Sequence, residues 1–101
     1  MIQPGVLPGW TDDIAADSQR AAVDVRDELV AAGLSPSTYI GSQGLDVRTD
    51  LGTLNRADVP AVMLEAGNLR NADDAALLTG AAGRARIADA LTAAITDFLN
   101  G

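Results

Sequence analysis

The chain has 101 residues, 48% of them hydrophobic, and a formal net charge of −7 at neutral pH. A chain of this length corresponds to one small domain or to part of one. Its acidic balance and its seven scattered arginines argue against a nucleic-acid partner, because phosphate binding needs clustered basic side chains.

Residue types that are absent exclude several kinds of site. Without cysteine, the chain has no disulfide framework, no thiolate nucleophile and no thiolate metal ligand. Without histidine, it has no Ser-His or Cys-His couple and lacks the commonest zinc ligand. No stretch approaches the roughly 18 apolar residues of a membrane span, so we expect none. The first residues lack the basic start and apolar region of a signal peptide, so export would need sequence outside this chain.

The first third of the chain predicts a strand end, a loop and a long helix. Prolines and glycines interrupt residues 1–10, which is typical of a strand that runs into a loop. Thr11 is followed by two aspartates, a pattern that favours a helix N-cap. Apolar and small residues then recur at helical spacing from Ile14 to Leu29, and Gly33 stands where a helix usually ends. Trp10 is expected to pack over this helix, and the alternative is that it lines a saccharide groove.

Residues 34–58 show little periodicity, and glycines interrupt them at positions 41, 44 and 52. A stretch of this length without regular structure is unusual inside a compact domain. We therefore expect it to carry function or to contain strands.

An unbroken apolar run over residues 59–64 ends at Glu65. The run has the length and composition of a buried strand in a parallel or mixed sheet with both faces covered. Parallel strands tend to present chemistry at their carboxyl ends. A lone carboxylate there is costly to bury unless it is paired or used. Two interpretations stay open: Glu65 is a functional carboxylate, or its side chain turns to solvent as the strand ends.

The last third of the chain predicts two helices. Asn71 is the expected N-cap of the first, with Asp74 three residues later in a capping-box arrangement. This short helix should end near Gly80. The second should cover residues 81–99 and carry one apolar stripe made of Ile87, Leu91, Ala94, Ile95, Phe98 and Leu99.

The order of the predicted elements indicates an α/β layer arrangement: a helix, an irregular segment, a buried strand and two further helices. One strand cannot form a sheet by itself, however, and both long helices need a sheet or another helix to cover. We therefore expect residues 1–101 to be the C-terminal part of a larger α/β domain.

Three segments of the chain closely resemble the C-terminal half of the zinc-dependent N-acetylmuramoyl-L-alanine amidases. The similarity is nearest to the mycobacterial cell-wall amidases of that family, covers nearly the whole chain and is most specific around Glu65. The matching residues are Arg48-x-Asp50-Leu51-x-x-Leu54-Asn55, Val59-Pro60-Ala61-Val62-Met63-Leu64-Glu65-x-Gly67-Asn68 and Asn71-x-x-Asp74-Ala75-x-Leu77-Leu78.

The resemblance implies a twisted, mainly parallel six-stranded sheet with helices on both faces. It implies an enzyme of the cell wall or periplasm that cuts the amide between N-acetylmuramic acid and the L-alanine of the peptidoglycan stem peptide. Family members hold one zinc ion with two histidines and a glutamate, all upstream of the part represented here. Glu28 is not at that ligand position. We therefore expect the zinc ligands outside this chain, in the N-terminal half of the amidase, which would be its partner. The chain itself would be one piece of a split amidase, a truncated amidase or a degenerate relative.

By the same resemblance, Glu65 matches a glutamate that acts in catalysis. It would take the proton of the attacking water as a general base and pass it to the leaving nitrogen as a general acid. Arg48, Asn55 and Asn68 are candidate substrate-binding residues, with the alternative that each only holds a loop or turn. The alternative function, from another class, is a non-catalytic binding or regulatory module with an amidase-like scaffold.

Overall fold

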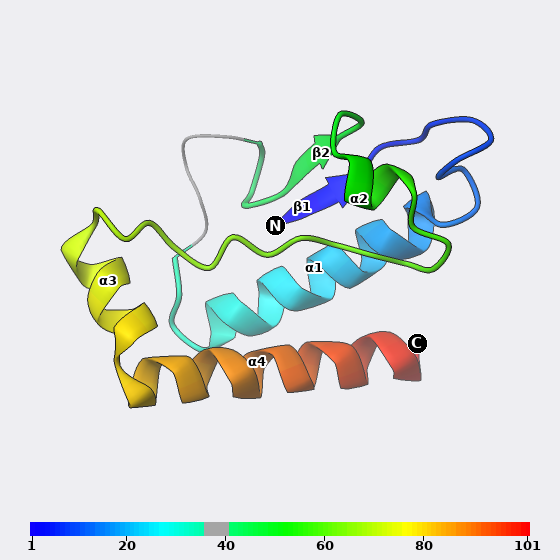
Figure 1. The fold of residues 1–101 in the computed structure, drawn as a ribbon. Helices are drawn as coiled ribbons and strands as arrows, with labels where there is room; N and C mark the ends of the chain where they lie inside the picture. Colours follow the sequence, from blue (N-terminus) through cyan, green and yellow to red (C-terminus); the bar gives the residue numbers. More distant parts are fainter. Residues whose placement is uncertain (36–40) are drawn as a thin grey trace.

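The computed structural model describes residues 1–35 and 41–101. Within them the fold is α/β: a small sheet, two long helices and two short ones (Figure 1). In chain order the elements are β1 (Ile2–Pro4), α1 (Ala15–Ala31), β2 (Asp46–Arg48), α2 (Gly52–Asn55), α3 (Ala72–Thr79) and α4 (Ala81–Asn100).

The sheet has β1 at its centre. On one side β2 pairs with it in parallel, with Asp46 opposite Ile2 and Arg48 opposite Pro4. On the other side Met63 forms an isolated antiparallel bridge with Ile2. Strand β2 lies inside the irregular stretch 34–58, which confirms that this stretch contains a strand.

The prediction of a buried strand over residues 59–65 is wrong for this chain. Only Met63 takes part in a bridge. Val59 is 67% exposed, Glu65 is exposed, and residues 61–64 are half-buried. A strand exists only where a partner pairs with it along its length, and β1 offers three residues. The apolar composition therefore predicted more burial and a longer strand than this segment has in the structure.

Helix α1 packs on β1, and α4 packs along α1 (Figure 1). The core between the helices contains Val25 and Leu29 from α1, and Ile87 and two alanines from α4. Gly33 ends α1 as predicted, with φ of +95°.

The hydrogen bonds around Gly33 identify the type of helix end. The Leu34 N–H donates to the Leu29 carbonyl at 3.0 Å, and the Gly33 N–H donates to the Val30 carbonyl at 2.9 Å. This pair of bonds is a Schellman motif, with Leu34 packed back on the core.

The start of α1 differs from the prediction. The helix begins at Ala15 with no side-chain cap, and the fully buried Thr11 closes the loop after β1 instead. Its hydroxyl donates to the Gly5 carbonyl at 2.6 Å and accepts from the Leu7 N–H at 2.8 Å. A threonine near a helix start can bond the preceding loop as well as the helix. Trp10, on the same loop, is 59% exposed, so its predicted packing is wrong.

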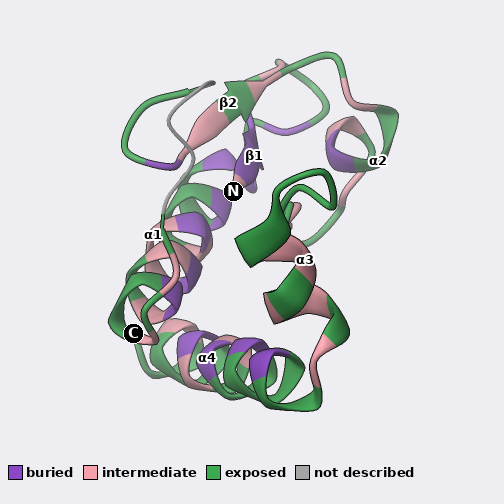
Figure 2. Ribbon diagram, turned by 90° about the vertical axis from the view of Figure 1, so that its left-hand side faces the viewer, coloured by how far each residue is buried: buried purple, intermediate pink, exposed green. Residues whose placement is uncertain are grey.

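Helices α3 and α4 begin and end close to the predicted residues. The Asn71 side chain accepts from the Asp74 N–H at 3.0 Å, which confirms the N-cap. The Asp74 carboxylate, however, accepts from the Asn68 N–H, outside the expected capping box. The apolar stripe of α4 is narrower than predicted: Ile95 is 57% and Leu99 74% exposed, because the buried positions of α4 turn towards α1 and α3 (Figure 2).

Candidate active site

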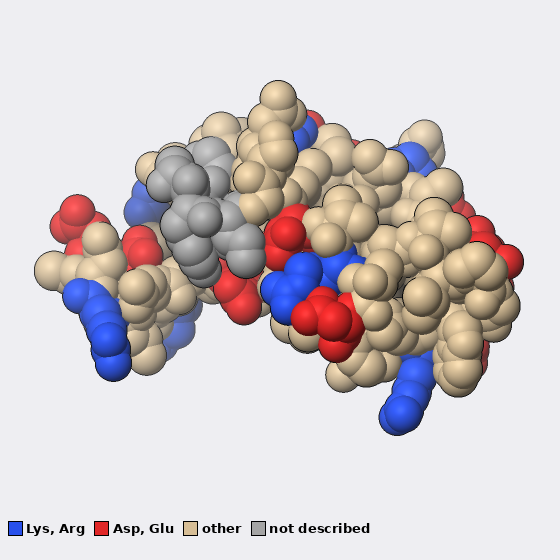
Figure 3. All heavy atoms as spheres, turned by 90° about the horizontal axis from the view of Figure 1, so that it is seen from above, with Lys and Arg blue, Asp and Glu red and all other residues tan. Residues whose placement is uncertain are grey.

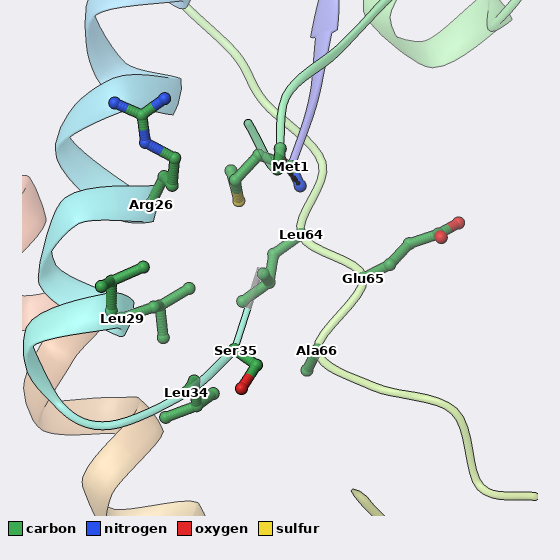
Figure 4. A pocket seen from close by; sticks show the side chains of 10 residues that line it. Met1, Arg26, Leu29, Leu34, Ser35, Leu64, Glu65 and Ala66 are labelled. Atoms are coloured by element: carbon green, nitrogen blue, oxygen red, sulfur yellow. Dashed lines mark hydrogen bonds between the residues drawn. The ribbon is translucent and has the colours of Figure 1, made fainter. Parts of the chain in front are cut away.

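Glu65 lies on an extended segment that passes in front of α1 (Figures 1 and 4). Side chains alternate along such a segment, so neighbours point to opposite sides. Leu64 points towards α1, whereas the Glu65 side chain points away from this helix (Figure 4). Both residues line a small cavity of about 70 Å³. Within the described part of the chain, the Glu65 carboxylate has no hydrogen bond and no ion pair. Because Glu65 is exposed, a molecule outside the chain has access to its carboxylate.

Two contacts before Glu65 and one after it hold the segment in place. The Ala61 N–H donates to the buried Ser18 hydroxyl at 3.0 Å. Met63 exchanges two backbone hydrogen bonds of 2.8 Å with Ile2. After Glu65, the Asn68 N–H bonds the Asp74 carboxylate at 2.9 Å. These anchors fix the backbone on both sides of the carboxylate.

Ser18 belongs to the apolar and small residues that recur at helical spacing between Ile14 and Leu29. Its contact with Ala61 was not predicted from the sequence. A polar residue within such a stripe was the available signal, since buried hydroxyls require a hydrogen-bond partner.

Arg48 is engaged by carboxylates of its own chain. Its Nε and Nη2 donate to the two oxygens of Asp50, each at 2.7 Å, and its Nη1 lies 3.5 Å from an Asp46 oxygen. This bidentate hydrogen bonding lowers the pKa of Asp50 and raises the pKa of Arg48. The guanidinium fork that would recognise a substrate carboxylate is already occupied, which favours the structural alternative for Arg48.

Asn55 ties α2 to the loop after β2. Its amide nitrogen donates to the Thr49 carbonyl at 2.8 Å. Its side-chain oxygen is buried and accepts no hydrogen bond from residues 1–35 or 41–101. The bond to Thr49 therefore gives Asn55 a structural role in this loop, which its side-chain oxygen does not share.

Asn68 forms the turn that follows the Glu65 segment. Its side-chain oxygen accepts from the Arg70 N–H at 3.0 Å, and its carbonyl accepts from the Asn71 N–H at 2.9 Å. Gly67 precedes it at a place where an added Cβ would lie 3.2 Å from atoms of α3. The glycine thus permits the close approach of this turn to α3.

The structure does not bring Arg48 and Glu65 together. Met63 lies opposite Ile2, and Glu65 is two residues further along the same segment. Arg48 lies opposite Pro4, on the other side of β1. The segment runs antiparallel to β1, so the two residues are four positions apart along the strand. This separation is roughly 13 Å along the strand and about 10 Å across two strand spacings. Asn68 lies on the same segment as Glu65, three residues after it, and is therefore nearer to it in sequence than Arg48 is.

The described residues do not fit a metal site. In residues 1–35 and 41–101, no three His, Cys, Asp or Glu side chains come together in a way that could hold a metal ion. The zinc ion that the resemblance implies would therefore need ligands from outside this chain.

On the face in Figure 3, basic side chains are dispersed and several lie beside acidic ones, with no basic patch. Among the helices of the described ranges, none combines the length and the apolarity that a bilayer crossing requires.

Comparison with known proteins identifies the family. Residues 9–97 match the family model described as N-acetylmuramoyl-L-alanine amidase. The chain belongs to this amidase family. A relative, the N-acetylmuramoyl-L-alanine amidase of Mycobacterium tuberculosis, is 41% identical over 85 residues, which are 84% of this chain and 35% of the relative.

Two crystal structures of N-acetylmuramyl-L-alanine amidases have the same arrangement as this amidase chain. The apo form from Mycobacterium abscessus has a TM-score of 0.87 at 39% identity and matches 97% of this chain. The amidase from Mycobacterium smegmatis has a TM-score of 0.87 at 36% identity and matches 98% of this chain. In both cases the match covers 45% of the solved chain, so this chain spans less than half the length of these relatives.

Proposed function

We propose that this chain is part of a peptidoglycan hydrolase that cleaves the amide between N-acetylmuramic acid and the L-alanine of the stem peptide, and that Glu65 is its catalytic residue. The observation that carries the proposal is the exposed Glu65 carboxylate on an anchored segment within the amidase motif, without a hydrogen bond or ion pair to residues 1–35 or 41–101. Membership of the family supports the reaction class.

Cleavage of an amide by water requires a group that moves a proton. The attacking water must lose a proton, and the leaving nitrogen must gain one because an amide anion is a very poor leaving group. One carboxylate can perform both steps, as general base and then as general acid. The Glu65 side chain extends away from α1 into open space, where a substrate amide would have access to it (Figure 4).

The remaining parts of the proposed enzyme lie outside this chain. Zinc ligands would come from the N-terminal half of the amidase, and the two halves together would complete a twisted, mainly parallel sheet with helices on both faces. The substrate belongs to the cell wall, so we place the enzyme outside the cytoplasm, in the cell wall or periplasm. The described residues contain no cluster of three or more side chains that could hold the metal.

We further propose substrate contacts for Arg48, Asn55 and Asn68, in addition to their structural roles. Asn68 follows Glu65 by three residues and lies on the same exposed segment. Asn55 has a side-chain oxygen without a hydrogen-bond partner. Arg48 would have to exchange Asp50 for a stem-peptide carboxylate, so its substitution should affect KM more than kcat.

The test is amidase activity of this chain combined with a zinc-ligand half from a family member. Glu65→Gln should lower kcat by about 10²- to 10⁴-fold, the usual contribution of a general acid–base group. Glu28→Gln is the matched control, because Glu28 is the one other glutamate in the sequence. Zinc content by atomic absorption should be equal in all three proteins. Normal activity of Glu65→Gln with zinc bound would remove Glu65 from catalysis.

One observation favours a second candidate, a non-catalytic binding or regulatory module. The described residues contain no cluster of three or more His, Cys, Asp or Glu side chains that could hold a metal ion. Such a module would bind peptidoglycan and release no stem peptide in any combination with a zinc-ligand half. Release of peptide by the assembled, zinc-loaded protein would exclude it.

A further inference from the structure

We propose that Arg70 is a specificity-determining residue, which binds a carboxylate of the stem peptide close to the amide that Glu65 would cleave. This inference rests on the proposed function, since it concerns the substrate of the same site. Unlike Arg48, Arg70 would take this role without giving up a side-chain contact in the described part of the chain.

The side-chain contacts of the arginines single out Arg70. The side chains of Arg56 and Arg70 form neither a hydrogen bond nor an ion pair with residues 1–35 or 41–101. Of these two, Arg56 directly follows α2, whereas Arg70 lies five residues after Glu65. The other five of the seven arginines donate side-chain hydrogen bonds to described residues: Arg20, Arg26, Arg48, Arg84 and Arg86.

Hydrogen bonds fix the turn that carries Arg70. The Asn68 N–H donates to the Asp74 carboxylate at 2.9 Å, and the Asn68 carbonyl accepts from the Asn71 N–H at 2.9 Å. The Arg70 N–H donates to the side-chain oxygen of Asn68 at 3.0 Å. Arg70 itself is exposed. The backbone of Arg70 is therefore positioned before a ligand binds, which lowers the entropy cost of binding at this residue.

This turn keeps Arg70 within reach of a substrate bound at Glu65. Five residues of fully extended chain span at most about 17 Å, and a turn shortens that distance. Beyond Ala66 the chain runs away from α1, as the Glu65 side chain does (Figure 4). An extended peptide residue spans about 3.5 Å. A carboxylate within the first residues after the L-alanine can therefore meet the Arg70 guanidinium while the scissile amide meets Glu65.

The charges around this turn favour a carboxylate as the ligand. A guanidinium presents its donors as a planar fork, from which a carboxylate accepts two parallel hydrogen bonds. The chain has 14 acidic residues against seven basic ones, so an acidic substrate needs a local cation. Neither Asp73 nor Asp74, the acidic residues closest to Arg70 in sequence, forms an ion pair with it. Within the described ranges, the positive charge of Arg70 is therefore not neutralised by a neighbour.

Two muramoyl dipeptides test the inference. The probes are N-acetylmuramoyl-L-alanyl-D-isoglutamate and its isoglutamine analogue, in which an amide replaces the α-carboxylate. The protein is this chain combined with a zinc-ligand half, as in the amidase test, with Glu65→Gln so that no probe is consumed. It should bind the carboxylate form at least about tenfold more tightly, because the amide loses the charge-assisted pair of hydrogen bonds. Equal affinities, as a merely solvated arginine would give, or no binding of either probe would overturn the inference.

Arg70→Met and Arg56→Met form a matched pair of variants. Each removes an exposed arginine whose side chain has no contact of this kind in the described ranges. Arg70→Met should lose the preference for the carboxylate form, and Arg56→Met should keep it. Arg70→Lys retains the charge without the fork, so its preference should be intermediate. A preference that survives Arg70→Met, or one that both methionine variants lose equally, would contradict the assignment. Thermal midpoints report whether each variant is folded.

Kinetics with Glu65 restored give a second measurement. A residue that only binds the substrate lowers KM without changing the chemical step. Arg70→Met should therefore raise KM for the carboxylate dipeptide by about tenfold and leave kcat nearly unchanged. The KM for the isoglutamine dipeptide should not change. A fall in kcat for both dipeptides, with KM unaltered, would contradict a role in binding the carboxylate.

The outcome for Arg70 is independent of the outcome for catalysis. A protein that binds the carboxylate dipeptide more tightly through Arg70 but cleaves neither dipeptide would refute the proposed function and keep the inference. A protein that binds and cleaves both dipeptides equally well would do the reverse.

Discussion

Leu64 and Glu65 are neighbours in sequence whose side chains lie on opposite sides of one extended segment (Figure 4). Leu64 packs against the core between α1 and α4, whereas Glu65 is exposed. The apolar side chain thus anchors the backbone from which the carboxylate projects.

Ser18→Ala should destabilise the protein by about 1–3 kcal/mol, because it removes the only described acceptor of the Ala61 N–H and leaves that donor unsatisfied. Urea denaturation measures the change. Ser42→Ala is the control: Ser42 is exposed and its hydroxyl has no hydrogen bond in the described ranges, so the free energy of unfolding should stay within about 0.5 kcal/mol. Equal effects of the two substitutions would contradict a role for Ser18 as an anchor.

Gly67→Ala should destabilise by about 1 kcal/mol, at the low end for overpacking, because the new methyl group would lie 3.2 Å from Asp74 and Leu78. Gly52→Ala is matched to it, since nothing lies within 4 Å of the position of its Cβ. That substitution should be neutral or stabilise by up to about 1 kcal/mol. The thermal midpoint should therefore fall for Gly67→Ala and stay the same or rise for Gly52→Ala. A rise for Gly67→Ala would show that α3 does not press on this turn.

Glu28→Gln should make the protein more stable at neutral pH. Hydrogen-bonding contact with Asp97, burial, and repulsion by Asp97, Asp24 and Asp27 raise the pKa of Glu28. A raised pKa in the folded state means that stability is fully present below the ordinary value of about 4.3 and falls as pH rises through the raised pKa.

Glu28→Gln removes the titrating carboxyl group and with it the loss of stability at higher pH. The urea midpoint of this variant should therefore exceed that of the wild type at pH 7, and the two midpoints should converge below about pH 4. Asp97→Asn should give a similar gain, and the double variant should gain less than the sum of the two. Additive gains would mean that Glu28 and Asp97 do not interact.

Arg48→Met should weaken the protein at neutral pH but not in acid. Bidentate hydrogen bonding by Arg48 lowers the pKa of Asp50, so this contribution is present above the ordinary aspartate pKa of about 3.9 and is lost as pH falls through the lowered value. The urea midpoints of wild type and variant should therefore differ at pH 7 and converge near pH 2. Arg56→Met, which removes an exposed arginine, should leave the pH dependence unchanged. A constant difference at all pH values would exclude the Arg48–Asp50 pair as its cause.

Local chemistry made several features of the fold predictable. Asn71 caps α3 and Gly33 ends α1, because each depends on the conformational preference of one residue and a few neighbours. Thr11 shows the limit of that reasoning: the same hydroxyl that suits a helix N-cap bonds the preceding loop instead. Ile95 and Leu99 fit a helical stripe, but their exposure depends on which helices pack against α4.

The sequence located Glu65 at the end of an apolar run and left open whether its side chain is functional or turns to solvent; in the structure Glu65 is exposed, and its role in catalysis stays a prediction. The predicted strand over residues 59–65 was wrong, because residues 61–64 need partners that are distant in sequence and that an apolar run does not identify. The occupation of Arg48 by Asp50 likewise depends on side-chain rotamers beyond β2, which a spacing pattern does not encode.

The bridge between Ile2 and Met63 also affects when the site can form during folding. It joins positions 61 residues apart, and the Ala61 contact to Ser18 spans 43 residues. Contacts of such long sequence separation form slowly, because the loop between them must close first. Helices α1 and α4 can begin to form from local interactions, whereas the backbone around Glu65 becomes fixed only after both ends of this long loop have met. The proposed catalytic carboxylate is therefore among the last parts of the chain to reach its final position.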